Sequence, residues 1–443
     1  MKVMQMIDRV LKLLFLIGFL SGCATVNQPA NTFKDTDFSD KTSIPKVALN
    51  PENDVTVILA FSGGGTRAAA LSYGVLEELE RTEIEINGEK KRLLDEVDVI
   101  SSVSGGSFTS AYYGVYGDQI FQDYKEDFLY MNVKDALVSR FLSPSHWLSS
   151  WGRTESASQY YQEQLFGDAT LGDMQSEHGP RIIINASDIT TGLRFSFIQE
   201  YFGLICSDAE SYPVSKAVAA SAAVPVLFEP VVLENLGGCQ QDAYEQHLPE
   251  NVSSLSYQSQ QTMREIGEYS DKEKNKYIHL VDGGITDNLG LLAIYDLLEL
   301  GQIHKFAHFQ PSVNPHHVIV ISVDASTNPD DSIGFSADVP TIEQTLQSVT
   351  DIQLHRYNDA TKDLFKKSME RWAEEASSDK VEVVPHFIEV NFQSTANLNK
   401  RHLFNQVVTD LSLDDEVVDQ IIQEGSGQLR NKPEFRELVT ALN

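Results

Sequence analysis

The sequence has few cysteines. Only three of its 443 residues are cysteine, at Cys23, Cys206 and Cys239. None of them stands with histidines or other cysteines at the spacing of a metal site, so we expect no metal. If the chain is exported, Cys206 and Cys239 are free to form a disulfide, but their positions in the sequence do not show whether they come within reach of each other.

Basic residues are also scarce. The chain carries 34 Lys and Arg against 64 Asp and Glu, for a net charge of −30. Proteins that bind nucleic acid need a basic face for the phosphates, which excludes nucleic acid as an expected partner. A chain this acidic is repelled by anionic membrane surfaces unless a separate anchor holds it there.

The N-terminus contains an apolar run that is too short to span a bilayer. Leu13–Leu20 is interrupted only by Gly18, and it follows the basic residues Lys2, Arg9 and Lys12. A basic segment, a short apolar run and small residues at its end are typical of an export signal. We expect residues 1–22 to be a signal peptide; the alternative is an uncleaved, buried helix.

The end of that signal resembles the bacterial lipobox. The residues are Leu20-Ser21-Gly22-Cys23, followed by Ala24. The resemblance implies cleavage before Cys23, lipidation of that cysteine and a firm membrane anchor made of several acyl chains. With Ala24 next, it favours an exported lipoprotein at the outer membrane, facing the periplasm. Residues 23–52 are polar without periodicity and are predicted to be a tether.

Beyond residue 53, apolar runs of strand length alternate with helical patterns. This order predicts an α/β fold, a three-layer domain with a mainly parallel central sheet flanked by helices. We expect one main domain over 53–325, with a polar surface insertion or flap at 240–275, and an α/β extension at 326–443 packed on the same sheet. The predicted strands are Val55–Phe61, Val97–Val103, Arg181–Asp188, Leu193–Phe197, Tyr277–Val281, His317–Val323 and Val381–Phe392, and the main predicted helices are Ala68–Leu79, Val214–Ala223, 341–373 and Leu413–Glu424.

Three glycine-rich corners follow three of these strands. The first is Gly63-Gly64-Gly65-Thr66-Arg67-Ala68. Glycines let backbone amides approach an anion closely, as in an oxyanion hole. The same spacing fits the weak form of a dinucleotide fingerprint, which requires an acid about twenty residues further on, where Glu83, Glu85 and Glu89 stand. A Walker loop is excluded because its Lys-Ser/Thr ending is missing.

The second corner is Ser102-Val103-Ser104-Gly105-Gly106. A serine between a buried strand and a helix start has its hydroxyl exposed above the helix amides, as in the nucleophile elbow G-x-S-x-G. Ser102 replaces the first glycine of that pattern. Ser107 fits less well because Thr109 stands where the second glycine belongs. The alternative is a tight turn of small residues.

The third corner is Asp282-Gly283-Gly284. A carboxylate at a strand end can accept the proton of a serine hydroxyl, or it can simply begin an Asp-Gly turn. Asp287 and Asn288 are expected to cap the next helix. In a parallel sheet the three corners share one edge, where ligands bind. Several histidines follow Asp282, so a Ser-Asp-His triad stays open, although no histidine on a loop stands out.

In this order the three corners resemble the patatin-like phospholipase family. Two further stretches are similar to it, Ala219–Phe228 and Asn185–Asp188 with Thr191-Gly192. The resemblance covers about residues 53–325, which it implies to be the catalytic domain, and it implies a Ser-Asp dyad rather than a triad. The implied nucleophile is Ser104 and the implied base is Asp282. The amides of Gly63, Gly64 and Gly65 would form the oxyanion hole, with Gly105 adding one, and Arg67 would organise the loop or contact a phosphate.

The reaction implied by the resemblance is hydrolysis of an acyl ester of a phospholipid or lysophospholipid, with no cofactor and no metal. Two alternatives stay open. One is a catalytically silent lipoprotein that binds lipid or a partner protein on the same scaffold. The other is a nucleotide-binding protein that uses the loop from Gly63 to Ala68.

Overall fold

The computed structural model describes most of the chain from residue 55 onward. The described residues are 29–35, 55–86, 88–143, 152–175, 179–239, 256–299, 315–327, 332–335, 337–377 and 382–443. The predicted signal peptide, Cys23 and most of the predicted tether lie outside them. Among the residues described, no helix is both long and apolar enough to cross a membrane.

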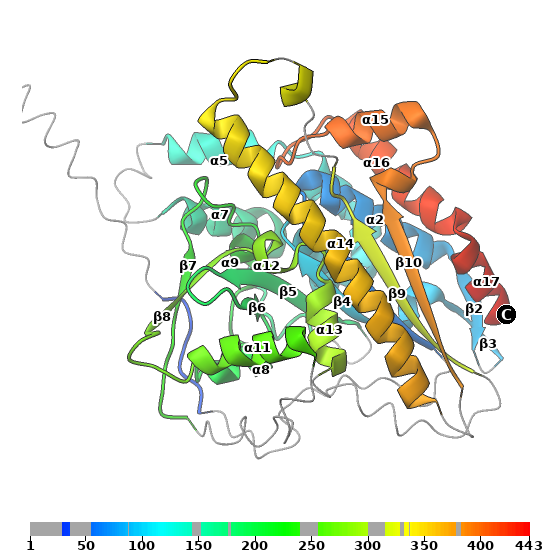
Figure 1. The fold of residues 1–443 in the computed structure, drawn as a ribbon, viewed down its shortest axis with the longest axis horizontal. Helices are drawn as coiled ribbons and strands as arrows, with labels where there is room; N and C mark the ends of the chain where they lie inside the picture. The colour runs from blue at the N-terminus through cyan, green and yellow to red at the C-terminus, as the bar shows by residue number, and fades with distance from the viewer. Residues whose placement is uncertain are drawn as a thin grey trace, which may run out of the picture.

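One eight-stranded sheet forms the centre of the molecule (Figure 1). The order is β10-β9-β1-β4-β5-β8-β7, with β6 paired to β5. Neighbours from β10 to β5 are parallel, while β6, β7 and β8 run antiparallel to their partners. The mainly parallel sheet is therefore confirmed. The strands are β1 Val55–Phe61, β4 Val97–Val103, β5 Arg181–Asp188, β6 Arg194–Ser196, β7 Val231–Glu234, β8 Tyr277–Asp282, β9 His316–Asp324 and β10 Val383–Asn391, and a separate hairpin joins β2 Glu83–Ile86 to β3 Glu89–Arg92.

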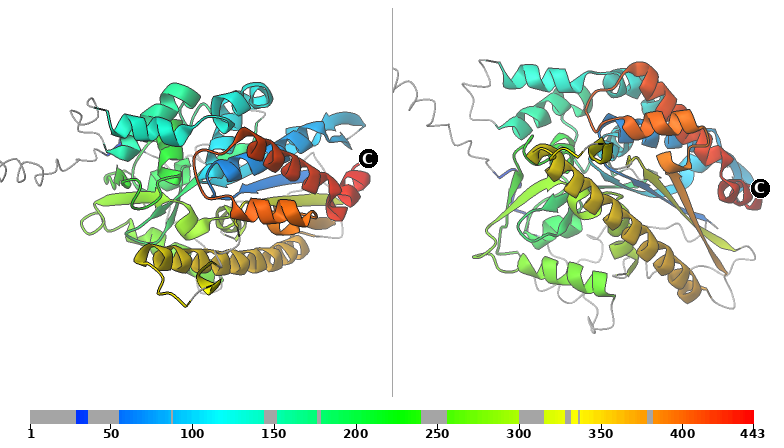
Figure 2. Two further views of the ribbon diagram at one scale, coloured as in Figure 1. Left: turned by 90° about the horizontal axis from the view of Figure 1, so that it is seen from above. Right: turned by 45° about the horizontal axis from the view of Figure 1, so that its top comes forward.

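Helices cover both faces of this sheet, as the continuous apolar runs of β1 and β9 require. Figure 2 shows α14 on one side of the strands and α2 on the other. The three-layer arrangement is that expected from the sequence. The helices are α2 Thr66–Arg81, α3 Gly105–Tyr116, α4 Ile120–Tyr124, α5 Val133–Phe141, α7 Arg153–Tyr161, α8 Gln199–Leu204, α9 Val214–Ser221, α11 Tyr257–Glu268, α12 Gly284–Asp287, α13 Leu291–Glu299, α14 Ile342–Ala376, α15 Leu398–Gln406, α16 Asp415–Asn431 and α17 Pro433–Ala441.

The C-terminal segment is built into this sheet. Strand β10 pairs with β9 along its whole length, and α16 packs against α2. That helix contact is unusually close: a Cβ on Gly74 would lie 2.2 Å from the carbonyl oxygen of Ile422. Glycine is therefore required where α2 meets α16.

The direction of β8 differs from the prediction. The sequence argument placed Asp282 at the end of a strand parallel to the others, but β8 is antiparallel to β5, and Asp282 lies opposite Ala186. The two ends still meet because β5 continues beyond Asn185, which pairs with Val103 at the end of β4. Strand β8 pairs with this overhang and brings its own end to the edge where β4 finishes.

The described part of the predicted surface insertion is a packed helix. Residues 240–255 lie outside the described chain, and α11 follows them. Its buried residues include Thr262 and Ile266, and the Tyr295 hydroxyl on α13 donates to Ser256 Oγ at 2.6 Å. This helix belongs to the layer around α13, so a flap stays a prediction only for the residues before it.

An N-terminal strap, residues 29–35, lies against the corner at Cys206. Its Lys34 amide donates to the Cys206 carbonyl at 2.9 Å, and Asn31 Nδ2 donates to Ser207 Oγ at 2.7 Å. Cys206 itself is joined to Cys239 by a disulfide, which answers the question that the sequence left open. The strap thus enters the folded body at a covalently closed loop.

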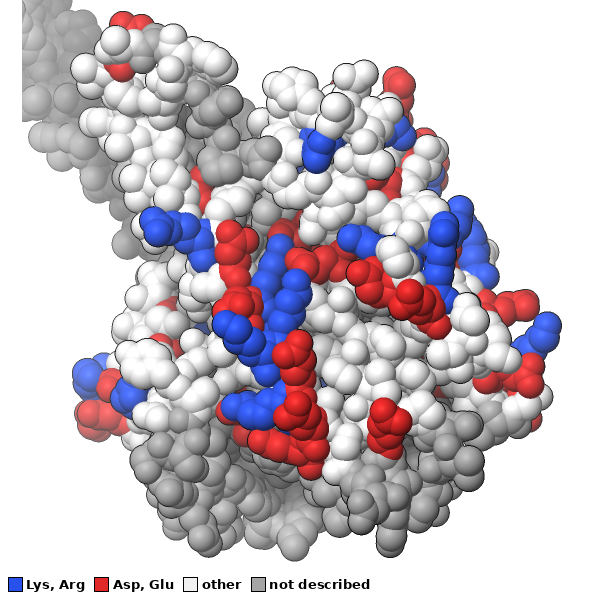
Figure 3. Space-filling model, turned by 45° about the vertical axis from the view of Figure 1, so that its right-hand side comes forward, with Lys and Arg blue, Asp and Glu red and all other residues white. Residues whose placement is uncertain are grey.

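Basic side chains on the face drawn in Figure 3 are interleaved with acidic ones. Along α14, Lys362 Nζ lies 2.8 Å from Asp324 Oδ2, and Lys366 Nζ lies 2.5 Å from Glu389 Oε2. These two lysines are paired with carboxylates, and the blue and red side chains alternate on this face without forming a broad basic patch of the kind that nucleic acid needs.

Candidate active site

Ser104 occupies a strained corner between β4 and α3. Its φ is +49° and its ψ is −118°, a conformation that non-glycine residues rarely adopt. The departure at Ser102 does not disturb the corner, because Ser102 Oγ accepts from Ser110 Oγ at 2.6 Å and donates to the Ile183 carbonyl at 3.3 Å. The displayed serine is the arrangement predicted from the sequence, rather than an ordinary turn.

The Ser104 hydroxyl donates to Asp282. Oγ lies 2.8 Å from Asp282 Oδ2, and the other carboxylate oxygen accepts the Gly284 amide at 2.8 Å. Burial raises the pKa of Asp282 to about 6, and the hydrogen bonds from Gly284 and Ser104 only partly oppose this effect. Asp282 is therefore ionised at neutral pH and is more basic than an exposed aspartate.

No described histidine bonds to this pair. The only hydrogen-bond partner of Ser104 Oγ among the described residues is Asp282, while His317 pairs with His386 across two strands at 2.8 Å. His304 and His308 lie outside the described residues. The geometry thus favours a two-residue arrangement, in which the carboxylate contacts the hydroxyl directly.

The glycine loop lies directly against the Ser104 corner. A Cβ on Gly105 would lie 2.1 Å from the Gly65 carbonyl oxygen and 2.7 Å from the Gly65 nitrogen. Gly65 has φ +62°, and a Cβ there would lie 2.2 Å from the Asp410 carbonyl oxygen. Both positions therefore require glycine, and the C-terminal segment supplies one wall of the loop.

The first of the three predicted oxyanion donors is already engaged. The Gly63 amide donates to the Asn288 carbonyl at 3.0 Å, so the prediction of Gly63 as an oxyanion donor needs correction. Gly63 instead lets the loop approach Ser104 closely, because a Cβ built on Gly63 would lie 3.4 Å from the Cβ of Ser104. The amides of Gly64, Gly65 and Gly105 have no acceptor among the described residues. These three can serve a developing oxyanion.

Arg67 organises the loop, the first of its two predicted roles. Its Nε donates to the Ala325 carbonyl at 2.8 Å, its Nη2 to Thr409 Oγ1 at 3.1 Å and its Nη1 to the Val407 carbonyl. Burial lowers the pKa of this guanidinium to about 10. With all three nitrogens bonded to protein, Arg67 ties the start of α2 to two distant segments, and the geometry does not favour contact with a phosphate.

Ser221 links the two halves of the site, a role that the sequence did not reveal. Its Oγ accepts the Ser104 amide at 2.8 Å and donates to the Asn185 carbonyl at 2.6 Å. Its carbonyl accepts the Gly283 amide at 3.1 Å. One residue at the end of α9 thereby holds the backbone of the nucleophile and the backbone next to Asp282.

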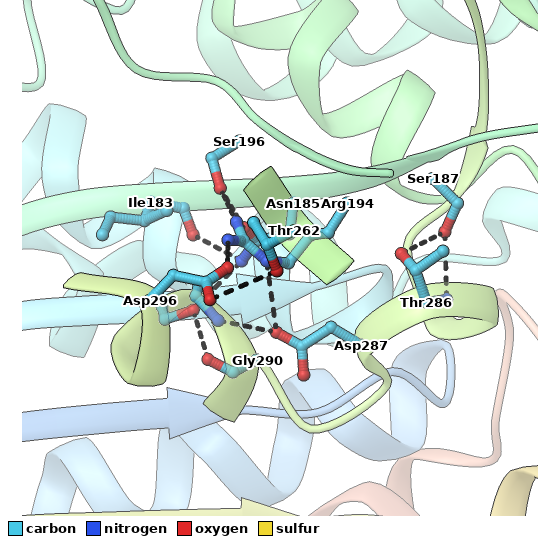
Figure 4. A network of polar contacts seen from close by, with 12 residues as sticks. Ile183, Asn185, Ser187, Arg194, Ser196, Thr262, Thr286, Asp287, Gly290 and Asp296 are labelled. Carbon is cyan, nitrogen blue, oxygen red and sulfur yellow. Dashed lines mark hydrogen bonds and ion pairs between the residues drawn. The ribbon is translucent and has the colours of Figure 1, made fainter. Parts of the chain in front are cut away.

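Behind the site, a buried charge cluster fixes β5 (Figure 4). Arg194 Nη2 donates to Asp296 Oδ2 at 2.6 Å, and Arg194 Nη1 lies 3.2 Å from Asn185 Oδ1. Asp287 Oδ2 accepts the Ala293 amide at 3.0 Å, so Asp287 caps α13 as predicted. The cluster connects α13 to the strand whose carbonyl accepts the Ser221 hydroxyl.

The acids proposed for a nucleotide ribose lie far from the loop. Glu83 and Glu85 are on β2 and Glu89 is on β3, beyond the far end of α2. Helix α2 has 16 residues, a length of about 24 Å. The arrangement therefore does not favour dinucleotide binding at the glycine loop.

Removing the Ser221 hydroxyl should misplace Ser104 with little effect on folding. In Ser221→Ala we expect labelling by a fluorophosphonate, which reacts with activated serines, to slow about 10–100-fold, since small displacements of reacting groups cost about that much. Ser215→Ala on the same helix, where Oγ accepts from Ser158 at 3.5 Å, should slow labelling less than about twofold. Equal rates in the two variants, with comparable Tm values, would show that Ser221 does not position Ser104.

Two comparisons relate the chain to known proteins, one through its sequence and one through its fold. The sequence model of the patatin-like phospholipase family matches residues 59–295, a range that runs from β1 to α13 and holds all three corners. A search of curated proteins found no match.

Solved structures with a similar arrangement include human GIVD cytosolic phospholipase A2, at 11% identity and a TM-score of 0.46, over 94% of this chain and 66% of that one. The same human enzyme in complex with methyl gamma-linolenyl fluorophosphonate matches at 12% identity and a TM-score of 0.43, over 88% and 59%. VipD from Legionella pneumophila matches at 12% identity and a TM-score of 0.33, over 94% and 71%.

The present chain thus spans about two thirds or less of the human enzyme's length. The TM-scores are too low for these likenesses to bear on the site. The family match alone covers more than half of the sequence, and it includes the strands and helices that carry Ser104, Asp282 and the glycine loop. The chain belongs to the patatin-like phospholipase family.

Proposed function

We propose that the protein is a serine acyl hydrolase that cleaves the carboxylic esters of phospholipids or lysophospholipids through a Ser104–Asp282 dyad. The observation that carries the proposal is the 2.8 Å hydrogen bond from Ser104 Oγ to Asp282 Oδ2, at a strained corner against the glycine loop. A hydroxyl, a basic carboxylate and unengaged amides together are what acyl transfer needs.

In the first half-reaction, Ser104 Oγ attacks the carbonyl carbon of the ester, and its proton moves to Asp282. The amides of Gly64, Gly65 and Gly105 donate to the oxyanion that forms. As the tetrahedral intermediate collapses, the alcohol leaves with the proton from Asp282, and the acyl group stays on Ser104.

In the second half-reaction, Asp282 takes a proton from water, which attacks the acyl-enzyme. The fatty acid is released, and Ser104 Oγ recovers its proton. Apart from the ester and the water, the chain's own residues supply every group in these steps.

The nucleophile is tested by labelling. The wild-type protein should react with a fluorophosphonate and hydrolyse a phospholipid, whereas Ser104→Ala should do neither, with activity reduced at least about 1,000-fold. Ser270→Ala, at an exposed serine in a turn, is the control and should behave as wild type. If the wild type is neither labelled nor able to hydrolyse any ester, the chain is instead a silent binding protein on this scaffold.

The base is tested by pH. Because Asp282 must be ionised to accept a proton and its pKa is raised to about 6, kcat/KM should fall tenfold per pH unit below about pH 6. Asp282→Asn should abolish activity at every pH. Full activity in this variant, or an acid limb near pH 4, would exclude Asp282 as the base.

The same variant has a stability signature. The pKa of Asp282 is higher in the folded than in the unfolded chain, so ionisation destabilises the fold, and stability falls as pH rises from about 4 to about 6. Asp282→Asn should therefore be more stable than wild type at pH 7, by about 3 kcal/mol, and the gain should disappear at pH 4. Thermal melts at both pH values separate loss of catalysis from loss of fold.

We also propose that Cys23 is lipidated and anchors the protein at the outer membrane, facing the periplasm. The support is the lipobox-like sequence Leu20–Cys23. Asn31, in the strap, follows Cys23 by eight residues, so the anchor would hold the folded body within at most about 28 Å of the lipid.

Substituting the cysteine tests the anchor. Cys23→Ser, expressed in a Gram-negative bacterium, should move from the membrane fraction to the soluble periplasmic fraction while keeping its activity on a soluble ester. Wild type and the Ser270→Ala protein should both sediment with membranes. Continued sedimentation of Cys23→Ser would rule out lipidation as the means of attachment.

A further inference from the structure

The side chain of Asn288 lies beside the Ser104–Asp282 pair and has no part in the two half-reactions. It is only 6% exposed, and its Nδ2 donates to Ser326 Oγ at 3.3 Å. Among the residues that the structure describes, no group donates to its Oδ1, so the prediction that Asn288 caps the next helix needs correction. Asn288 Oδ1 is therefore a buried acceptor still able to receive a hydrogen bond.

Two glycines show where this oxygen lies. A Cβ built on Gly63 would lie 2.7 Å from Asn288 Oδ1 and 3.4 Å from the Cβ of Ser104. A Cβ built on Gly284 would lie 3.1 Å from the same oxygen and 2.9 Å from Asp282 Oδ1. Asn288 Oδ1 thus borders both the nucleophile and the base.

The two glycines keep side chains away from this oxygen. Neither Gly63 nor Gly284 has φ in the left-handed region, so the path of the backbone does not explain why glycine stands at either position. An added Cβ would instead meet Asn288 Oδ1 at both positions. Glycine here leaves the oxygen accessible to a molecule as small as water.

Hydrolysis of the acyl-enzyme needs such an acceptor. Water brings two protons, of which Asp282 takes one, and the second stays on the attacking oxygen. Asp282 Oδ1 already accepts the Gly284 amide at 2.8 Å, and Ser104 Oγ is esterified at this stage. An O–H group in a buried site is costly without an acceptor, and an amide oxygen provides one without competing as a base.

We propose that Asn288 Oδ1 accepts a hydrogen bond from the water that hydrolyses the acyl-enzyme, and so aims the water oxygen at the ester carbonyl carbon. The inference rests on the proposed function and adds a catalytic residue for its second half-reaction. As the new carbon–oxygen bond forms, one water proton moves to Asp282 and the other stays bonded to Asn288. When the bond to Ser104 Oγ breaks, the proton on Asp282 passes to Ser104, and the fatty acid leaves with the second proton.

Competition between water and methanol for the acyl-enzyme tests this role. Methanol has one O–H proton, which goes to Asp282, and it has none left for Asn288. The measured quantity is the ratio of methyl ester to free acid formed from p-nitrophenyl butyrate in dilute methanol. Both nucleophiles react with the same acyl-enzyme through the same base. The ratio is therefore independent of the amount of folded protein and of the ionisation of Asp282.

Three variants separate the acceptor from the space that it fills. Asn288→Leu keeps the bulk but removes the acceptor, so the ratio should rise about tenfold, the effect of one lost hydrogen bond. Asn288→Asp restores an acceptor of the same shape, and its ratio should return to within about twofold of wild type. Asn358→Leu is the matched control, because Asn358 on α14 is also buried and also donates to Ser326 Oγ, at 3.1 Å; its ratio should equal that of wild type.

Kinetics on the same ester distinguish the two half-reactions. In Asn288→Leu, kcat/KM, which reports formation of the acyl-enzyme, should match wild type. The rate at which the acyl-enzyme is hydrolysed after the burst of p-nitrophenolate should fall about tenfold. Asn288→Ala takes the place of Asn288→Leu if the larger side chain prevents folding.

Two results would overturn this inference alone. One is an unchanged ratio in Asn288→Leu, and the other is an equal rise in Asn288→Asp, which would show that shape rather than hydrogen bonding matters. A wild type that hydrolyses no ester would overturn the proposed function, and this inference with it.

Discussion

The site depends on a backbone contact that leaves no room for a side chain. Gly105, directly after the nucleophile, lies so close to Gly65 that an added Cβ would be 2.1 Å from its carbonyl oxygen. This contact places unengaged amides of two loops side by side. It also requires β1 and β4 to end at matching levels, which their parallel register ensures. The register of β1 against β4 therefore also determines where the amide donors of the site lie.

Asp282, the proposed base, has no contact with the buried cation of this region, Arg194. Arg194 lies between Asp287 and Asp296 and offsets their charges (Figure 4). Asp282 receives only an amide and a hydroxyl, with no cation among the causes of its shifted pKa. An arginine beside Asp282 would have lowered its pKa and weakened it as a base. Arg194 instead stabilises β5 and reaches the pair only through Asn185 and Ser221.

The three corners and most strands could be predicted from the sequence, because glycine spacing and continuous apolar runs can each be recognised within a few consecutive residues. What the sequence could not predict depends on residues far apart in the chain. The backbone of Asp410 packs against Gly65 although the two are more than 300 residues apart in the chain. Ser221 accepts the amide of Ser104 across a separation of 117 residues. The antiparallel course of β8 follows from the overhang of β5, a length difference that no motif records. Gly63 is a glycine like Gly64 and Gly65, and only the structure shows that its amide already donates to the Asn288 carbonyl.

The strap at residues 29–35 determines where a pull on the N-terminus would act. Lys34 and Asn31 bond to the loop closed by Cys206 and Cys239, and the Glu234 amide at the end of β7 donates to Asn31 Oδ1. A force arriving from an anchor would therefore be borne first by a cross-linked loop at the β7 margin of the sheet. Strand β1 and the glycine loop follow later in the chain, and β4, β5 and β8 lie between β1 and β7 in the sheet. Strand β8, which carries Asp282, pairs directly with β7, whereas β4, which leads to Ser104, lies two strands further inward. A pull on the N-terminus would therefore reach the proposed base before it reached the proposed nucleophile.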